Sequence, residues 1–139
     1  MFFGPLNVSK NEQLTDLSAL YLSEVLRRQD FQHSHIKKLD MSKTKMQEKA
    51  GMFIGEALLS NPEYPIEYIK FKEINLEEIG LHRILEAANA NKHIKRINVG
   101  IISDKGLSIM SELLASNTTL LRLEFSESKV SLALNLFSR

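Results

Sequence analysis

The chain has 139 residues, which is enough for one modest domain and too few for two independent hydrophobic cores. Its 43% hydrophobic and 25% charged residues are typical of a folded globular protein and argue against a disordered or membrane-embedded chain. With 18 basic against 17 acidic residues, it has no overall charge that would attract nucleic acid or an anionic membrane. The absence of cysteine excludes disulfide scaffolds, thiolate nucleophiles and cysteine-based metal sites, and it fits a reducing intracellular compartment.

A six-residue motif recurs along the chain, with apolar side chains at its first, fourth and sixth positions. Four clear copies occupy residues 36–41, 66–71, 94–99 and 120–125, and a weaker copy opens the chain at residues 3–8. The copies start at residues 3, 36, 66, 94 and 120, so a unit has between 26 and 33 residues. Such short apolar segments predict strands, and their regular recurrence predicts a repeat protein.

A helix is expected after each of the first four strands. The first helix is expected to start near Ser9, since Ser9 and Glu12 have the spacing of a capping box. The next two carry Gly51 and Gly80 near their starts, and Ser103 is the expected N-cap of the fourth. Apolar residues recur at helical spacing within these segments, for example at positions 81, 84, 85 and 88.

Asparagines mark the expected ends of three of these helices. Asn61, Asn91 and Asn117 each follow an apolar helical segment. Asparagine tolerates the left-handed backbone conformation that often ends a helix, so we expect that conformation at these positions. The last segment, residues 130–139, is strongly apolar and is expected to act as a C-terminal cap of the domain.

Strand–helix units of this length and pattern resemble the ribonuclease-inhibitor subclass of leucine-rich repeats. Gly51, Gly80 and Gly106 match the glycines that start the family's helices. The resemblance implies an α/β solenoid of four to five units over residues 1–139 as a single domain, with parallel strands on the concave face and helices on the convex face. One departure is clear, because the family's turn asparagine is replaced by Thr44, Ile74, Ile102 and Ser128, so we expect less regular turns.

The polar strand positions predict a stripe on the concave face. Third positions of successive strands hold Lys38, Tyr68, Arg96 and Arg122, and fifth positions hold Asp40, Lys70, Asn98 and Glu124. Neighbouring strands lie about 4.8 Å apart, so these side chains are expected to stack across the sheet and to face solvent. The candidate partner-binding residues are Lys38, Tyr68, Lys70, Arg96, Asn98, Arg122 and Glu124. The alternative is an ordinary solvated face, since strand alternation places polar residues there in any case.

Catalytic and metal-binding motifs are not found. His33 and His35 could supply half of a metal site, but no third ligand lies near them, and a solvated loop explains them better. There is no phosphate-binding glycine loop, nucleophile elbow or H-E-x-x-H pattern, so neither an enzyme nor a cofactor is expected. The lysines at 37, 38, 43, 45 and 49 lack the interleaved aromatic residues of a nucleic-acid site.

The sequence therefore favours a protein–protein interaction module without catalysis, which binds a partner protein with an acidic surface on its concave face. The alternative is a homodimer or an assembly subunit held through the apolar ends, with Phe2, Phe3, Leu134 and Phe137 as contacts. The longest apolar stretches fall well short of the roughly 20 residues of a spanning helix, so no membrane insertion is expected. An intracellular, cytoplasmic location is expected, and a secreted bacterial effector is the alternative that the family resemblance leaves open.

Overall fold

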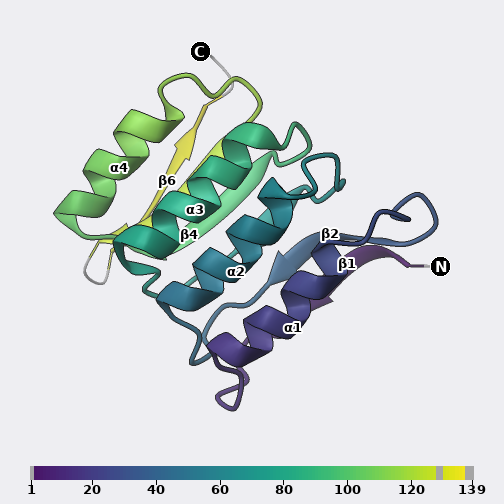
Figure 1. The fold of residues 1–139 in the computed structure, drawn as a ribbon. Coiled ribbons are helices and arrows are strands. Elements are labelled where there is room, and N and C mark those ends of the chain that lie inside the picture. The colour runs from purple at the N-terminus through teal and green to yellow at the C-terminus, as the bar shows by residue number, and fades with distance from the viewer. Residues whose placement is uncertain (1, 128–129, 137–139) are drawn as a thin grey trace.

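The computed structural model of the protein describes residues 2–127 and 130–136. Strands and helices alternate along this part of the chain until the last strand, as the repeat predicts (Figure 1). The elements are β1 (Phe3–Asn7), α1 (Asp16–Leu26), β2 (His35–Asp40), α2 (Glu48–Leu59), β3 (Tyr68–Lys70), α3 (Glu77–Ala90), β4 (Arg96–Ile101), α4 (Asp104–Leu114), β5 (Arg122–Glu127) and β6 (Val130–Asn135).

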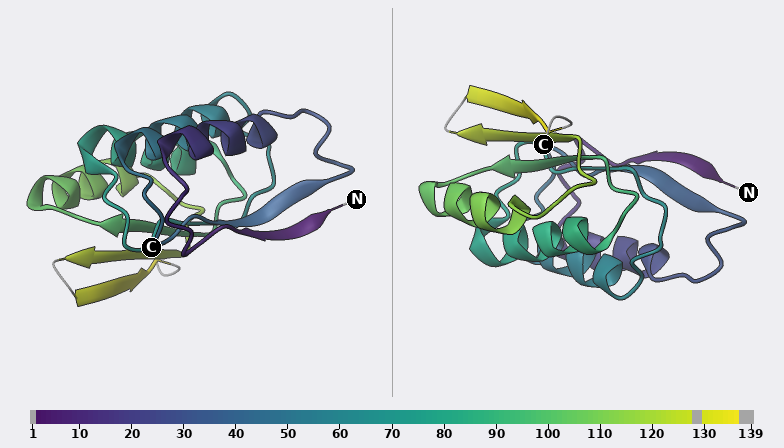
Figure 2. Two further views of the ribbon diagram at one scale, coloured as in Figure 1. Left: turned by 90° about the horizontal axis from the view of Figure 1, so that it is seen from below. Right: turned by 90° about the horizontal axis from the view of Figure 1, so that it is seen from above.

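The strands form one sheet in which spatial order follows chain order, from β1 to β6. Strands β1 to β5 pair in parallel, whereas β6 turns back and pairs with β5 in antiparallel orientation. The helices lie side by side on one face of the sheet (Figures 1 and 2). The opposite face, which we call the open face, corresponds to the predicted concave face. The predicted α/β repeat of parallel strands and covering helices is thus confirmed.

The apolar motif positions build the core between the sheet and the helices. Leu39, Ile69, Ile97 and Leu123 occupy the fourth positions and are at most 3% exposed. The sixth positions hold Met41, Phe71, Val99 and Phe125, which are at most 6% exposed. They pack in one cluster with helix residues such as Ile54, Leu58, Ile84 and Leu85. Burying each of these large side chains contributes roughly 1.5–3 kcal/mol to the stability of the fold. The apolar positions of the repeat are therefore the positions that form the core.

Glycines bring α2 and α3 unusually close together. A Cβ atom on Gly80 would lie 2.5 Å from the carbonyl oxygen of Glu48, and one on Gly51 would lie 2.7 Å from the Gly80 carbonyl oxygen. No real Cβ tolerates such distances to backbone. Glycine at this position of the repeat is therefore a packing requirement, because two helix backbones meet where a side chain would stand.

The asparagines before the strands act through their side chains. The expectation of left-handed backbone is wrong for them, since Asn91 is extended at φ −95° and neither Asn61 nor Asn117 has positive φ. All three are buried, and each amide Nδ2 donates to a carbonyl of the preceding unit, those of Leu26, Tyr64 and Ala88 at 2.9, 2.8 and 3.3 Å, respectively. These bonds join successive units at one end of the strands.

The turns after the strands are more regular than expected. Lys10, Lys43 and Glu73 occupy equivalent places after β1, β2 and β3, and all have left-handed backbone, with φ of 62°, 57° and 64°. In the next unit Gly100 has φ +78°. The expected helix start at Ser9 is wrong, because Ser9 and Lys10 form this turn and α1 begins only at Asp16. The expected cap of α4 is confirmed, since Ser103 Oγ accepts a hydrogen bond from the Gly106 N–H at 3.2 Å.

The two ends of the sheet carry exposed apolar side chains. Phe2 and Phe3 are 44% and 43% exposed at the β1 end. At the other end, β6 takes up most of the predicted cap region, but all of its residues are exposed, and only the following Leu136 packs partly against the core. The described residues do not include Ser128 or the last part of the predicted cap, residues 137–139, which contains Phe137. No helix in the described part of the chain is long and apolar enough to cross a bilayer.

Candidate functional site

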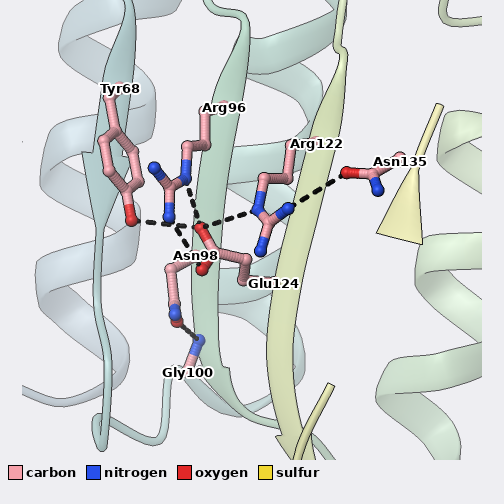
Figure 3. A network of polar contacts seen from close by, with 7 residues as sticks. All are labelled: Tyr68, Arg96, Asn98, Gly100, Arg122, Glu124 and Asn135. Atoms are coloured by element: carbon pink, nitrogen blue, oxygen red, sulfur yellow. Dashed lines mark hydrogen bonds and ion pairs between the residues drawn. The ribbon is translucent and has the colours of Figure 1, made fainter. Parts of the chain in front are cut away.

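The predicted stripe is assembled in the predicted register on the open face. Lys38 pairs with Tyr68, Tyr68 with Arg96, and Arg96 with Arg122 in neighbouring parallel strands. The second row runs in the same way from Asp40 through Lys70 and Asn98 to Glu124. The side chains of one row therefore project from four adjacent strands toward the same side. Figure 3 shows Tyr68, Arg96 and Arg122 of the first row on three of these strands.

Glu124 is the centre of a polar network on this face (Figure 3). Its carboxylate accepts two hydrogen bonds from Arg96, from Nε to Oε1 at 2.5 Å and from Nη2 to Oε2 at 3.0 Å. The Tyr68 hydroxyl donates to Oε1 at 3.1 Å. Arg122 Nε lies 3.9 Å from the same oxygen, while Arg122 Nη1 donates to Asn135 Oδ1 at 3.1 Å. One carboxylate thus orients groups from β3, β4 and β5, and the network extends to β6.

The Tyr68 ring lies between two cations. Arg96 Cζ is 4.3 Å and Lys38 Nζ is 4.9 Å from the ring centroid. Both distances fall within the range in which a cation is attracted to the face of an aromatic ring. Tyr68 is only 9% exposed, so its ring forms a largely covered base on which the two cations lie.

The network shifts the pKa of three of its members. Burial acts to raise the pKa of Glu124, but the hydrogen bonds from Arg96 and Tyr68 outweigh burial and hold this pKa below its usual value. Burial, together with the neighbouring negative charge of Glu124, raises the pKa of Tyr68 to about 12. The hydrogen bond to Glu124 raises the pKa of Arg96. At neutral pH the network therefore holds a carboxylate, a guanidinium and a neutral phenol.

Two of the fifth-position residues are not solvent-facing. Asp40 is 6% and Asn98 is 7% exposed, so the expectation of exposure is wrong for both, as it is for Tyr68 in the third-position row at 9%. Asp40 Oδ1 accepts from the Ser42 N–H at 3.0 Å, and Asn98 Oδ1 accepts from the Gly100 N–H at 2.9 Å. These side chains close the turns that follow their strands, and Asn98 offers a partner little surface.

A hollow of about 270 Å³ lies beside the network on the open face. Its lining includes Lys70 and Arg122 from the sheet, Lys72 from the turn after β3, and Ser131 from β6. Within the described residues, neither Lys70 nor Lys72 forms an ion pair. Sequence reasoning did not select Lys72, Ser131 or Asn135. Lys72 could have been found from strand alternation. It follows Lys70 by two residues, so it is expected on the same face of the sheet, just past the end of β3.

The histidines take structural positions. His35 Nδ1 lies 2.8 Å from the Phe31 carbonyl oxygen, and the His35 ring packs edge-on against Phe3 and Tyr64. His82 Nδ1 lies 2.8 Å from Glu86 on the surface of α3. Among residues 2–127 and 130–136, no group of three or more histidine, aspartate or glutamate side chains is arranged to hold a metal ion.

No family model and no curated protein matches the chain. Among solved structures, the chain is similar to the leiomodin-1 actin-binding site 2, with a TM-score of 0.75 and 20% sequence identity. The match covers 88% of this chain and 69% of that chain. Together with the alternating units and the parallel sheet, this similarity establishes that the protein has the arc-shaped α/β fold of a ribonuclease-inhibitor-like leucine-rich-repeat domain.

Proposed function

We propose that the protein is a non-catalytic protein-binding module that uses its open, concave face. The partner-binding surface consists of Lys38, Tyr68, Lys70, Arg96, Asn98, Arg122 and Glu124, with Lys72 added at its edge. Tyr68, Arg96 and Arg122 are held in one orientation by their contacts with Glu124, so less of their side-chain entropy is lost when a partner binds. Arginine and tyrosine are also the residues that most often carry the binding energy of interfaces.

The charge that this surface presents is the observation that carries the proposal. Its two carboxylates present little negative charge to solvent. Asp40 is buried in a turn, and the Glu124 side chain is only 16% exposed and is bound by Arg96. Among residues 2–127 and 130–136, no carboxylate pairs with the lysine side chains at 38, 70 and 72. The face is therefore positive although the chain as a whole is nearly neutral, and it fits a protein surface rich in aspartate and glutamate.

Actin is the first partner to test. The reason is the similarity to a solved domain named as an actin-binding site. At 20% identity this similarity supports the fold, and the choice of actin as partner is our proposal. An intracellular location agrees with this partner and with the absence of cysteine.

The experiment measures binding to actin monomers and to actin filaments at low and moderate salt. The wild-type protein is compared with a variant carrying Lys38→Glu, Lys70→Glu and Lys72→Glu. These lysines are chosen because they take no part in the Glu124 hydrogen bonds, so the fold should be kept. The control carries Lys45→Glu, Lys49→Glu and Lys105→Glu, which make the same change in net charge away from the open face, and of these three only Lys105 gives up an ion pair, the exposed one with Glu78.

Loss of binding in the open-face variant alone, with at least a tenfold weaker Kd, supports both the face and the partner. Equal loss in both variants points to nonspecific electrostatics and contradicts the proposed face. If wild-type protein does not bind actin, the partner is wrong. The same pair of variants then serves to rank the proteins captured from the source cell, and a protein lost only from the open-face variant identifies the partner.

A further inference from the structure

Strand β6 forms an edge of the sheet whose outer backbone groups are unpaired within the described chain. The Leu136 N–H donates to the Leu121 carbonyl at 2.7 Å, and the register then continues without a shift from Asn135 opposite Arg122 to Val130 opposite Glu127. Because backbone groups alternate in direction along an antiparallel strand, those of the even-numbered residues point toward β5. The N–H and C=O groups of Ser131, Ala133 and Asn135 therefore point outward.

The two edges of the sheet differ in how they resist pairing with another strand. Edge strand β1 contains Pro5, and its pairing with β2 shifts register between Gly4 and Pro5. Proline and irregular register are devices by which proteins block edge-to-edge association. Strand β6 has the sequence VSLALN, with neither proline nor charge, and its register is regular over its whole length.

We propose that β6 is the dimerisation edge of this protein and that it pairs with β6 of a second copy. The pairing is antiparallel about a two-fold axis that passes beside Ala133. In this register Ala133 faces Ala133 of the second copy, and Ser131 faces Asn135 of the second copy. All outward groups of the three residues then form ladder hydrogen bonds, and the interface is isologous, as in most homodimers.

The side chains of β6 agree with this register. Val130, Leu132 and Leu134 are 61%, 41% and 49% exposed, and they lie on the helix side of the sheet opposite Leu123 and Phe125. Across the two-fold axis, Leu132 meets Leu134 of the second copy, so apolar side chains cover one another. No charge lies between Val130 and Leu136 to repel the second copy. The sheet becomes continuous, and both open faces point to the same side, which makes the protein bivalent for its partner.

Disulfide trapping tests the register, because the chain has no cysteine of its own. In the proposed dimer the Cα atoms of the two Ala133 residues lie about 5.5 Å apart, as in a hydrogen-bonded antiparallel pair, which a disulfide can span. The two Ser131 residues lie roughly 14 Å apart, which is beyond its reach. Under mild oxidation we expect Ala133→Cys to cross-link as a covalent dimer and Ser131→Cys to form the same noncovalent dimer without a cross-link. Equal rates for both variants, or faster cross-linking of Ser131→Cys, would overturn the proposed pairing.

Sedimentation equilibrium over a range of concentrations tests the dimer itself. We expect the wild-type mass to rise from 15.9 kDa toward twice that value. Ala133→Pro should stay monomeric, because it removes an outward N–H while leaving the bonds between β5 and β6 intact. Phe3→Lys at the opposite edge should leave the dimer unchanged, and a circular dichroism melt checks that both variants fold. A wild-type protein that stays monomeric at all concentrations, or a dimer lost in Phe3→Lys and kept in Ala133→Pro, contradicts the proposal.

Discussion

The hydroxyl of Tyr68 donates a hydrogen bond to Glu124 across an intervening strand, at 3.1 Å, although the two residues are 56 positions apart in the chain. Between them lies Arg96 of β4, which binds the same carboxylate and also lies over the Tyr68 ring. The order of the three side chains on the open face thus depends on a single acid. Removal of this acid is therefore informative for both stability and binding.

Glu124→Gln should lower the free energy of unfolding by about 1–2 kcal/mol. The neutral amide accepts weaker hydrogen bonds than the carboxylate, and it leaves Arg96 and Arg122 close together without a counter-charge. Urea denaturation measures the change. Glu127→Gln is the matched control, because Glu127 lies on the same strand but is exposed. A loss as large in Glu127→Gln as in Glu124→Gln would show that the network contributes nothing specific.

The stabilisation from Glu124 should disappear in acid. The pKa of this carboxyl is lower in the folded protein than in the unfolded chain, where it is about 4.3. The contribution is therefore present above the unfolded value and is lost as pH falls through the folded value. Denaturation of wild-type protein and Glu124→Gln should give different stabilities at pH 7 and converge toward pH 3. A difference that stays constant over this range contradicts the assignment.

Tyr68 should ionise at a higher pH than an ordinary tyrosine. Its pKa of about 12 in the folded protein lies above the value of about 10 that is usual in an unfolded chain. An absorbance titration of the tyrosines should therefore contain a late step that is missing in Tyr68→Phe. Because the unfolded chain loses this proton first, stability should also fall between pH 10 and pH 12, and it should fall less in Tyr68→Phe.

Asn91→Ala should destabilise the protein by about 2–3 kcal/mol. The Asn91 side chain is fully buried, donates to the Tyr64 carbonyl, and accepts from the backbone N–H groups of His93 and Ile94 at 2.7 and 3.2 Å. Alanine leaves these backbone groups buried without partners. Asn11→Ala is the control, since Asn11 also accepts a backbone N–H but lies in an exposed turn. Thermal unfolding measures the difference. Equal melting temperatures for Asn91→Ala and Asn11→Ala would contradict the stabilising role of the Asn91 side chain.

Gly80→Ala should be more damaging than Gly106→Ala. Both changes improve helix propensity, so the difference between them reports the fit of a methyl group. At Gly80 the new Cβ meets the backbone of α2, whereas at Gly106 its nearest neighbours are the side chains of Ile102 and Leu81. We expect overpacking to cost about 1–3 kcal/mol at Gly80 and clearly less at Gly106, as measured by chemical denaturation. The reverse order would mean that the two helices can separate freely.

The sequence predicted the repeat and the register because both follow from one physical rule. A strand that is buried on one face alternates its side chains, so the apolar motif positions identify the core side and the polar positions identify the open face. Lys38, Tyr68, Arg96 and Arg122 are aligned as expected for this reason. Their role in binding a partner stays a prediction.

The details of the network could not be predicted from spacing. Strand alternation says that Glu124 and Arg96 share a face, but the direction of each side chain depends on its neighbours in three dimensions. The burial of Asp40 and Asn98 was also missed, because aspartate and asparagine that close a turn have the same place in the pattern as solvated ones. The start of α1 was misplaced since Ser9 belongs to a turn motif that only comparison of the units reveals.

The sequence also contains a pattern that predicts the antiparallel direction of β6. Val130, Leu132 and Leu134 alternate with Ser131, Ala133 and Asn135, which is the period of a half-buried strand. Only a short connection separates this strand from β5, and such a connection permits an antiparallel pair but is too short for a parallel crossover. The pattern and the loop length together predict the observed hairpin.

The close approach of α2 and α3 also affects the shape of the open face. Strands repeat about every 4.8 Å whereas packed helices need about 8–10 Å, and this mismatch bends a strand–helix array into an arc. Where Gly51 and Gly80 let two helices approach each other, the mismatch is smaller and the local curvature falls. We therefore expect the arc to be flattest in its middle, beneath Tyr68 and Arg96, and an open face of that shape would suit a broad and gently rounded partner better than a narrow peptide.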